Sequence, residues 1–166
     1  LASTDEEVMV KILAAYDTHG RAVFGHVVPV KGAGEDRYAV DRLVEDVRWL
    51  GYSRISLRSD NENAILDLLT KTLKELRIVV VGDEDVKESG VPDQILEEHS
   101  ARFDSSSNGA IENGVKRLAG MIRTHKLCLE ERIGRVIPPH HAIITWLVEW
   151  CAWVLTMRLV SETATT

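Results

Sequence analysis

The short run Ile55–Asp60, I-S-L-R-S-D, constrains the fold of this chain more than any other stretch. Its apolar residues Ile55 and Leu57 alternate with polar ones, which is the period of a half-buried β-strand. The run ends in an acid, and Asn61 behind it is a favourable N-cap for a helix. Open α/β sheets usually bind ligands at the carboxyl ends of their strands. We therefore expect a central strand that presents Asp60 at such an edge.

Segments with the period of strands and of helices alternate along the first half of the chain. Val8–Tyr16 and Ala22–Val30 are apolar and rich in β-branched residues, and they predict a β-hairpin. The polar turn between them contains Gly20, which is available for positive φ. Apolar residues then recur at helical spacing in Glu35–Leu50 and again behind the strand. These two stripes are Val40, Leu43, Val44, Val47 and Leu50, and then Ile65, Leu68, Leu69 and Leu73.

The second half predicts one more strand, a long connection and two helices. Leu76–Gly82, L-R-I-V-V-V-G, is mostly apolar and favours an interior strand. Asp83–Ser107 favours a long loop with one helical turn at Gln94–His99. Helical period returns in Gly109–Leu129, and His141–Val160 is apolar nearly all round, so we expect it to be buried in the core or against a partner. The periodic residues are Ile111, Val115, Leu118, Ile122 and Leu129, and then Trp146, Trp150 and Trp153.

Composition and element order place the chain in the α/β class, as one domain with a mixed sheet flanked by helices. Its 166 residues, 45% hydrophobic and 28% charged, exclude a disordered chain. The formal net charge of -6 requires any nucleic-acid surface to be local. Cys128 and Cys151 lack metal-like spacing, so we expect reduced thiols and an intracellular protein, nuclear or cytoplasmic. Glu149 and Arg158 interrupt the last apolar segment, so we expect no membrane span.

A polar loop, S-S-S-N-G-A-I-E at Ser105–Glu112, opens the third helical segment. Asn108 is placed to cap this helix, and Glu112 falls in its first turn. Carboxylates are the ligands that Mg²⁺ and Mn²⁺ prefer, so Asp60 and Glu112 predict a metal site if the fold brings them together. A basic strip follows on the same helix, for which a solvated face is the alternative interpretation. Its residues are Lys116, Arg117, Arg123 and Lys126.

The two motifs together, S-D-N at Ser59–Asn61 after a strand and S-N-G-A-I-E at Ser107–Glu112 opening a helix, resemble the catalytic domain of retroviral and retrotransposon integrases. The resemblance covers roughly Val8–Leu129 and implies a ribonuclease H-like fold. It implies that Asp60 and Glu112 are the second and third acids of an Asp, Asp, Glu triad that binds two metal ions. It also implies DNA contacts, at Lys116, Arg117, Arg123, Asn61 and Asn108.

The chain departs from the family pattern at two points. The gap between the two motifs is longer than in the compact retroviral pattern. The first acid of the family precedes the strand that matches Lys11–Tyr16, which places it at or before Leu1, so we expect a fragment of a longer polyprotein. Within the hairpin Asp17 is the best candidate for this acid, but it matches the hairpin tip, where an Asp that bonds its own backbone is the alternative.

The resemblance implies a polynucleotidyl transferase of a transposable element that processes DNA 3′ ends and joins them to target DNA during DNA integration. Two alternatives stay open: a decayed core that binds nucleic acid or protein without catalysis, and a ribonuclease H-like nuclease that cleaves without joining. We expect the tryptophan stripe to lie in the core or in a homo-oligomer interface. His140 and His141 are expected to start the last helix and not to bind zinc.

Overall fold

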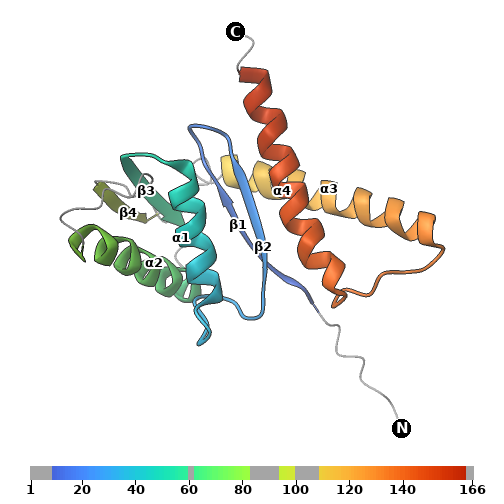
Figure 1. Cartoon of the computed structure of the whole chain (residues 1–166), viewed down its shortest axis with the longest axis horizontal. Coiled ribbons are helices and arrows are strands. Elements are labelled where there is room, and N and C mark those ends of the chain that lie inside the picture. Colours follow the sequence, from blue (N-terminus) through green and yellow to red (C-terminus); the bar gives the residue numbers. More distant parts are fainter. Residues whose placement is uncertain (1–8, 60–61, 83–93, 100–108, 164–166) are drawn as a thin grey trace. The chain divides into compact units, whose positions relative to one another are not determined.

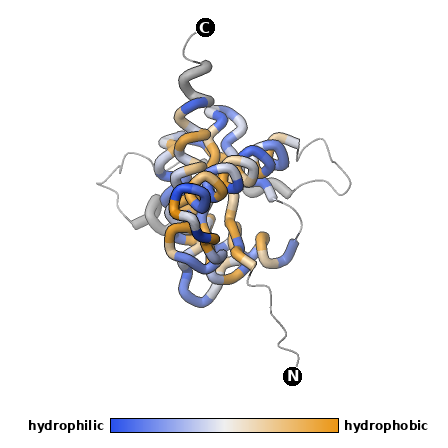
Figure 2. The backbone as a smooth tube through the Cα atoms, turned by 90° about the vertical axis from the view of Figure 1, so that its right-hand side faces the viewer, coloured by the Kyte–Doolittle hydropathy of each residue, from blue (hydrophilic) through white to orange (hydrophobic). Residues whose placement is uncertain are grey.

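A computed structural model describes residues 9–59, 62–82, 94–99 and 109–163 of the chain. In this part four strands and four helices follow in the order β1-β2-α1-β3-α2-β4-α3-α4, which confirms the α/β class (Figure 1). The chain divides into two compact units. The hairpin unit comprises Leu1–Val28 and Gly109–Thr166, and the central unit comprises Pro29–Asn108. Apolar residues run through the strands and helices of both (Figure 2).

The predicted hairpin is confirmed, since β1 (Lys11–Tyr16) pairs antiparallel with β2 (Val23–Val28). The Asp17 N–H donates to the Ala22 carbonyl at 2.8 Å and closes the turn. Positive φ occurs at Arg21 (60°) and not at Gly20, so that detail of the prediction was wrong. The Gly20 N–H donates a hydrogen bond to Asp17 Oδ2 at 2.7 Å, and the left-handed residue of the turn is Arg21, one position later.

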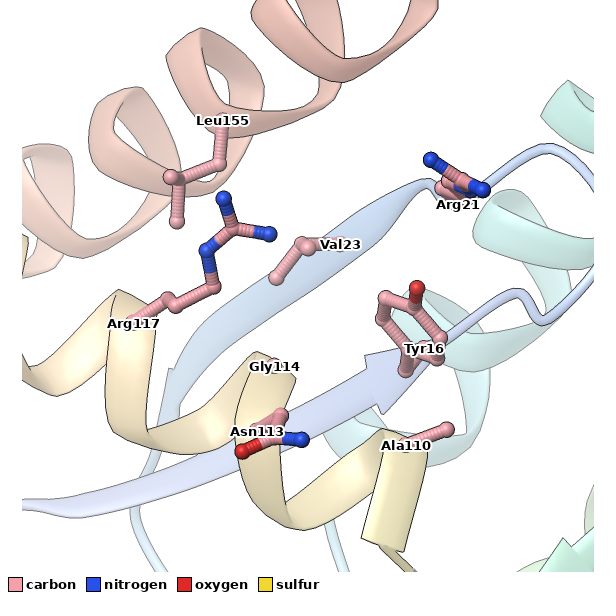
Figure 3. Close-up of a pocket in the computed structure, with 8 residues that line it drawn as sticks. All are labelled: Tyr16, Arg21, Val23, Ala110, Asn113, Gly114, Arg117 and Leu155. Carbon is pink, nitrogen blue, oxygen red and sulfur yellow. The ribbon is translucent and has the colours of Figure 1, made fainter.

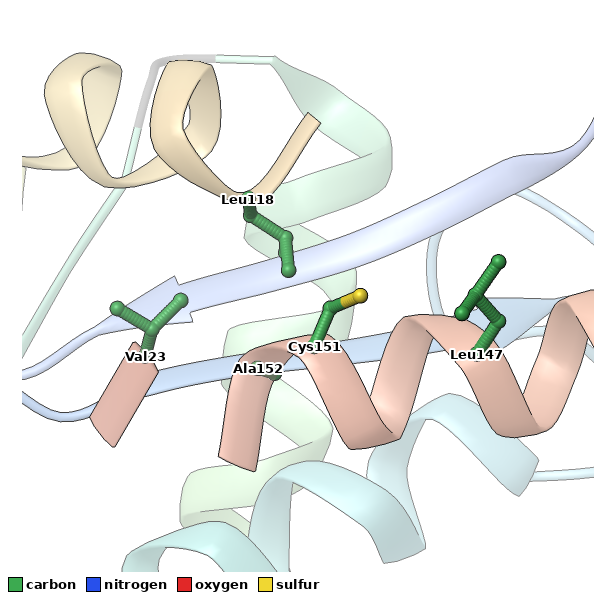
Figure 4. Close-up of a cluster of buried hydrophobic side chains, with 5 residues drawn as sticks. All are labelled: Val23, Leu118, Leu147, Cys151 and Ala152. Carbon is green, nitrogen blue, oxygen red and sulfur yellow. The ribbon is translucent and has the colours of Figure 1, made fainter. Parts of the chain in front are cut away.

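Two helices pack on the hairpin and form the core of this unit. They are α3 (Gly109–Ile133), which contacts β1, and α4 (Ala142–Thr163), which lies along β2. Figure 4 shows the cluster in which Val23 of β2 and Leu118 of α3 meet the buried side of α4. The Thr156 hydroxyl accepts from the Val23 N–H at 2.9 Å and donates to its carbonyl at 3.0 Å. The α4 residues of the cluster are Leu147, Cys151 and Ala152.

Three side chains expected in apolar stripes of this unit are exposed. Val115 is 41% exposed, because Gly114 faces β1 in its place. A Cβ built on Gly114 would lie 3.0 Å from the Tyr16 ring, so the absence of a side chain permits this close packing. Trp146 and Trp153 are 55% and 57% exposed, so a core role was wrong for both. Their helix buries its opposite side instead.

The central unit contains α1 (Tyr38–Leu50), β3 (Arg54–Ser59), α2 (Asn63–Gly82) and β4 (Gln94–His99). Both predicted helical stripes pack inward, with Leu50 and Ile65 half-buried and the other members buried, and α1 packs on α2. Gly51 ends α1 with φ 64° and donates its N–H to the Arg48 carbonyl at 3.1 Å. The predicted strand is confirmed as β3, in which Ile55 and Leu57 are half-buried between exposed neighbours.

Two predictions in the central unit were wrong. Leu76–Gly82 is not a strand but the end of α2, because the fully buried Leu76 continues the helical stripe of Leu69 and Leu73. Gln94–His99 is not a helical turn but β4, which pairs in parallel with β3. The rest of the predicted long loop lies outside the described residues.

The described strands form two separate pairs, one antiparallel and one parallel, in place of the single mixed sheet that was expected.

Candidate functional site

The residues predicted to form a metal site belong to different units. Ser59 is the last residue of β3, and Asp60 follows it directly in the sequence. Asp60 itself lies outside the described residues, as do Asn61 and Asn108. Glu112 lies in the first turn of α3, in the hairpin unit. Each motif therefore has the local secondary structure that the sequence predicted, and the pairing of the two acids stays a prediction.

The Glu112 carboxylate is open to solvent. Its side chain is 59% exposed, and its Oε2 lies 3.9 Å from Nζ of Lys116, which is 75% exposed. Such an ion pair between exposed side chains holds its partners weakly. A carboxylate is also favourable in the first turn of a helix, where the backbone N–H groups carry partial positive charge. Glu112 is thus an accessible anionic ligand on a rigid helix.

The predicted basic strip is interrupted at its C-terminal end. The Lys126 ammonium donates to Glu130 Oε1, which also accepts from the Ile137 N–H at 2.7 Å. The hydrogen bond from Lys126, and next that from Ile137, hold the pKa of Glu130 below its ordinary value. The prediction of an open basic strip was therefore wrong at Lys126, because Glu130, four residues further along α3, pairs with it. Arg123 is exposed and donates from Nε to the Ala119 carbonyl at 3.2 Å.

A pocket of about 320 Å³ opens beside α3 in the hairpin unit (Figure 3). The hairpin contributes three residues to it, the first two turns and a half of α3 contribute four, and α4 contributes one. Arg117 extends from α3 toward Val23 and Leu155, and Tyr16 stands at the end of β1 (Figure 3). The lining residues are Tyr16, Arg21, Val23, Ala110, Asn113, Gly114, Arg117 and Leu155.

This pocket is cationic, with an apolar floor. Its polar and charged lining residues are Arg21, Arg117, Tyr16 and Asn113, and no acidic residue lines it. Within the described residues neither Arg21 nor Arg117 has an ion pair. Sequence reasoning singled out Arg117 and missed the other three. No periodic sequence pattern marks Tyr16, Arg21 and Asn113. Tyr16 and Arg21 flank the hairpin turn, and only the packing of the hairpin on α3 brings them near Asn113.

The remaining candidates have local structural roles. Both Asp17 oxygens accept backbone hydrogen bonds, from the N–H of His19 at 3.0 Å and of Gly20 at 2.7 Å, which confirms the turn interpretation. The Ile143 N–H donates to His141 Nδ1 at 3.2 Å, which confirms that this histidine starts α4. Among the described residues no group of three or more His, Cys, Asp or Glu gathers around a common point. No helix in the described part of the chain has the length and apolar character needed to span a membrane.

No protein-family model matches this chain, and no curated protein does. The resemblance to integrases therefore depends on the two motifs and their structural settings. It stays a proposal.

Proposed function

We propose that this chain is the catalytic core of a retroelement integrase, with a ribonuclease H-like fold and DNA as its substrate. The reaction is metal-dependent phosphoryl transfer, in 3′-end processing and strand transfer. One observation carries the proposal: a strand ends immediately before Asp60, and a helix presents Glu112, exposed, in its first turn. The resemblance to integrases requires one acid at the end of a strand and another in the first turn of a later helix. Such a protein acts on DNA inside the cell, so we expect it in the nucleus or cytoplasm.

Asp60 and Glu112 would hold Mg²⁺ or Mn²⁺. The chemistry of Glu112 fits a hard divalent cation, because its oxygens are exposed and its contact with Lys116 is loose. Bound metal supplies an activated water or hydroxyl and stabilises charge at the phosphorus. Lys116 lies one turn further along the same face of α3, where its ammonium can bind a backbone phosphate. Arg117, Arg123, Asn61 and Asn108 complete the proposed DNA contacts.

A metal titration tests this proposal. Mn²⁺ added to the ¹⁵N-labelled chain should broaden amide signals around Glu112, and Mg²⁺ should compete with it. Both Asp60→Asn and Glu112→Gln should abolish the effect, because each removes one anionic ligand from a shared site. Glu131→Gln is the matched control, since Glu131 is an exposed acid near the other end of α3. Loss in only one of the two variants, or in neither, would contradict a shared metal site.

Assays of DNA binding, cleavage and joining, carried out beside the metal titration, separate the alternatives. A chain that binds DNA but no metal would be a non-catalytic relic of an integrase. A chain that binds metal and cleaves DNA without joining it would be a ribonuclease H-like nuclease.

We also propose that the exposed side of α4 joins copies of the chain. Trp146, Trp153 and Met157 are 55%, 57% and 40% exposed, and their spacing places them on one face. Trp150 lies between them, stacked on Trp146 with ring centroids 5.7 Å apart. Sedimentation should show an oligomer that dissociates in Trp146→Ser/Trp153→Ser. A monomeric parent chain would contradict this interface.

A further inference from the structure

The two arginines of the cationic pocket approach it from different elements. Arg21 lies just before β2, in the left-handed conformation with φ 60°, and Arg117 extends from α3 (Figure 3). Neither has an ion pair among the described residues, and no carboxylate lines the pocket. Two like charges that share a pocket without a counter-ion favour the binding of an anion.

We infer that this pocket binds the phosphate group of a nucleotide. Two guanidinium groups supply two positive charges and several N–H donors, which match the charge and the oxygens of a phosphomonoester dianion better than a single carboxylate. The Tyr16 hydroxyl and the Asn113 amide add neutral donors at the same place. The charge and the donor set together identify phosphate as the bound group.

The floor and the size of the pocket identify the rest of the ligand. Val23, Leu155 and Ala110 give it apolar surface, and the Tyr16 ring offers a flat face. A volume of about 320 Å³ is several times that of an inorganic phosphate and falls at the lower end of small-molecule pockets. A base and sugar fill such a space, since bases stack readily on aromatic rings.

The pocket lies on a different side of α3 from the proposed metal ligand. At roughly 100° per residue, Lys116 lies about 40° from Glu112 around the helix axis. The four α3 residues of the pocket lie about 100° to 160° away from Glu112 around the same axis. No proposed metal ligand lines the pocket, so phosphate binding here can be tested separately from metal binding, while Arg117 belongs both to the pocket and to the proposed DNA contacts.

Binding is tested by NMR on the ¹⁵N-labelled chain in a phosphate-free chloride buffer. The probes are dAMP, adenosine and inorganic phosphate, and the reporters are the Asn113 and Gly114 amides. We expect dAMP to shift both signals and adenosine to leave them in place. Arg21→Gln and Arg117→Gln should each raise the dissociation constant for dAMP about tenfold or more, because each removes a charged hydrogen-bond donor.

Arg132→Gln is the matched control for charge. It removes the same charge from the same helix, at an exposed position about 22 Å from Arg117 along the axis. Its affinity for dAMP should equal that of the parent chain. Tyr16→Phe provides a second variant, which removes one hydroxyl and should weaken binding less than either arginine substitution. An unchanged spectrum outside the pocket would establish that each variant is folded.

Three outcomes would overturn the inference: no shift with dAMP, equal shifts with adenosine, or equal weakening by Arg132→Gln. Inorganic phosphate that shifts the same amides with the same arginine dependence would support it. Short single strands with a 5′-phosphate or a 5′-hydroxyl then identify the source of the phosphate. Preference for the phosphorylated strand over dAMP would identify a DNA end, and preference for dAMP a free nucleotide. Loss of metal binding in Glu112→Gln should leave dAMP binding unchanged, which separates this test from that of the catalytic proposal.

Discussion

The two ends of α3 carry the same pair of residue types at the same spacing, with opposite results. At the N-terminal end, Glu112 and Lys116 are four residues apart, 3.9 Å from one another, and 59% and 75% exposed. At the C-terminal end, Lys126 and Glu130 are also four residues apart, in direct contact, and 28% and 13% exposed. The second carboxylate also accepts the Ile137 N–H from the segment that leads into α4.

The difference teaches that spacing alone does not decide what such a pair does. Partial burial and a backbone donor hold Glu130 in one place, so this pair links the end of α3 to the following segment. Solvent around Glu112 and Lys116 weakens their attraction, so both groups stay accessible to a metal ion or a phosphate. One end of the helix is organised for stability, and the other leaves its charges available for ligands.

The largest effect on stability is expected from Glu130→Ala. The substitution leaves the Ile137 N–H without its acceptor and Lys126 without its counter-ion. The melting temperature, followed by circular dichroism, should fall clearly, and the Ile137 amide should exchange faster with solvent. Glu131→Ala, at an exposed neighbouring position, should change neither. Equal melting temperatures for the two variants would remove the distinction between the ends of α3.

The C-terminal pair should also make stability depend on pH. Hydrogen bonds from Lys126 and Ile137 lower the pKa of Glu130 in the folded chain. A lowered folded-state pKa means that the ionised carboxylate stabilises the fold above its ordinary pKa, and that this stabilisation is lost as the pH falls through the folded value. The difference in melting temperature between the parent chain and Glu130→Gln should therefore shrink in acid. A difference that stays constant from neutral pH to acid would contradict this origin.

Two glycines of α3 give an intermediate effect and test how closely its N-terminal half packs. A Cβ on Gly120 meets no described atom within 4 Å, so Gly120→Ala should stabilise the chain by about 1 kcal/mol through helix propensity. A Cβ on Gly114 would lie 3.0 Å from Tyr16, so crowding should offset that gain. We expect Gly114→Ala to range from no change to a loss of about 2 kcal/mol in urea unfolding. Equal stabilisation by Gly114→Ala and Gly120→Ala would mean that the Tyr16 side chain moves aside without cost and that α3 is not closely packed here.

The fold could be predicted wherever the local pattern and the packing agree. Period-2 alternation marks β3, and the stripe from Val40 to Val47 marks α1, because in both cases one side of the element faces a core. The β-branched run at the end of α2 favours a strand locally, but the chain continues the helix that buries Leu76. β4 exists through pairing with β3, a contact between distant segments that no local pattern contains.

The candidate site, too, could be predicted from the sequence only in part. The setting of Glu112 could be predicted, since a polar loop and a first-turn acid mark a helix start within a few residues. The cationic pocket could not, because Arg21 and Arg117 are far apart in the sequence and come to line one pocket only through the packing of the hairpin on α3. The pairing of Lys126 with Glu130 follows the i,i+4 spacing of a helix and could have been predicted, whereas the Ile137 N–H that also holds Glu130 comes from the segment beyond α3.

The smallest effect on stability is expected from Glu112→Gln, and it gives the sharpest contrast with the C-terminal pair. The substitution removes a weak ion pair between exposed side chains, so the free energy of unfolding should change by less than about 0.5 kcal/mol. Metal binding should nevertheless be lost, because the amide is neutral and a far poorer ligand for Mg²⁺. Urea unfolding and Mn²⁺ broadening on the same sample measure both quantities. A large loss of stability would show that Glu112, like Glu130, holds the fold together, and the N-terminal end of α3 would then no longer differ from its C-terminal end.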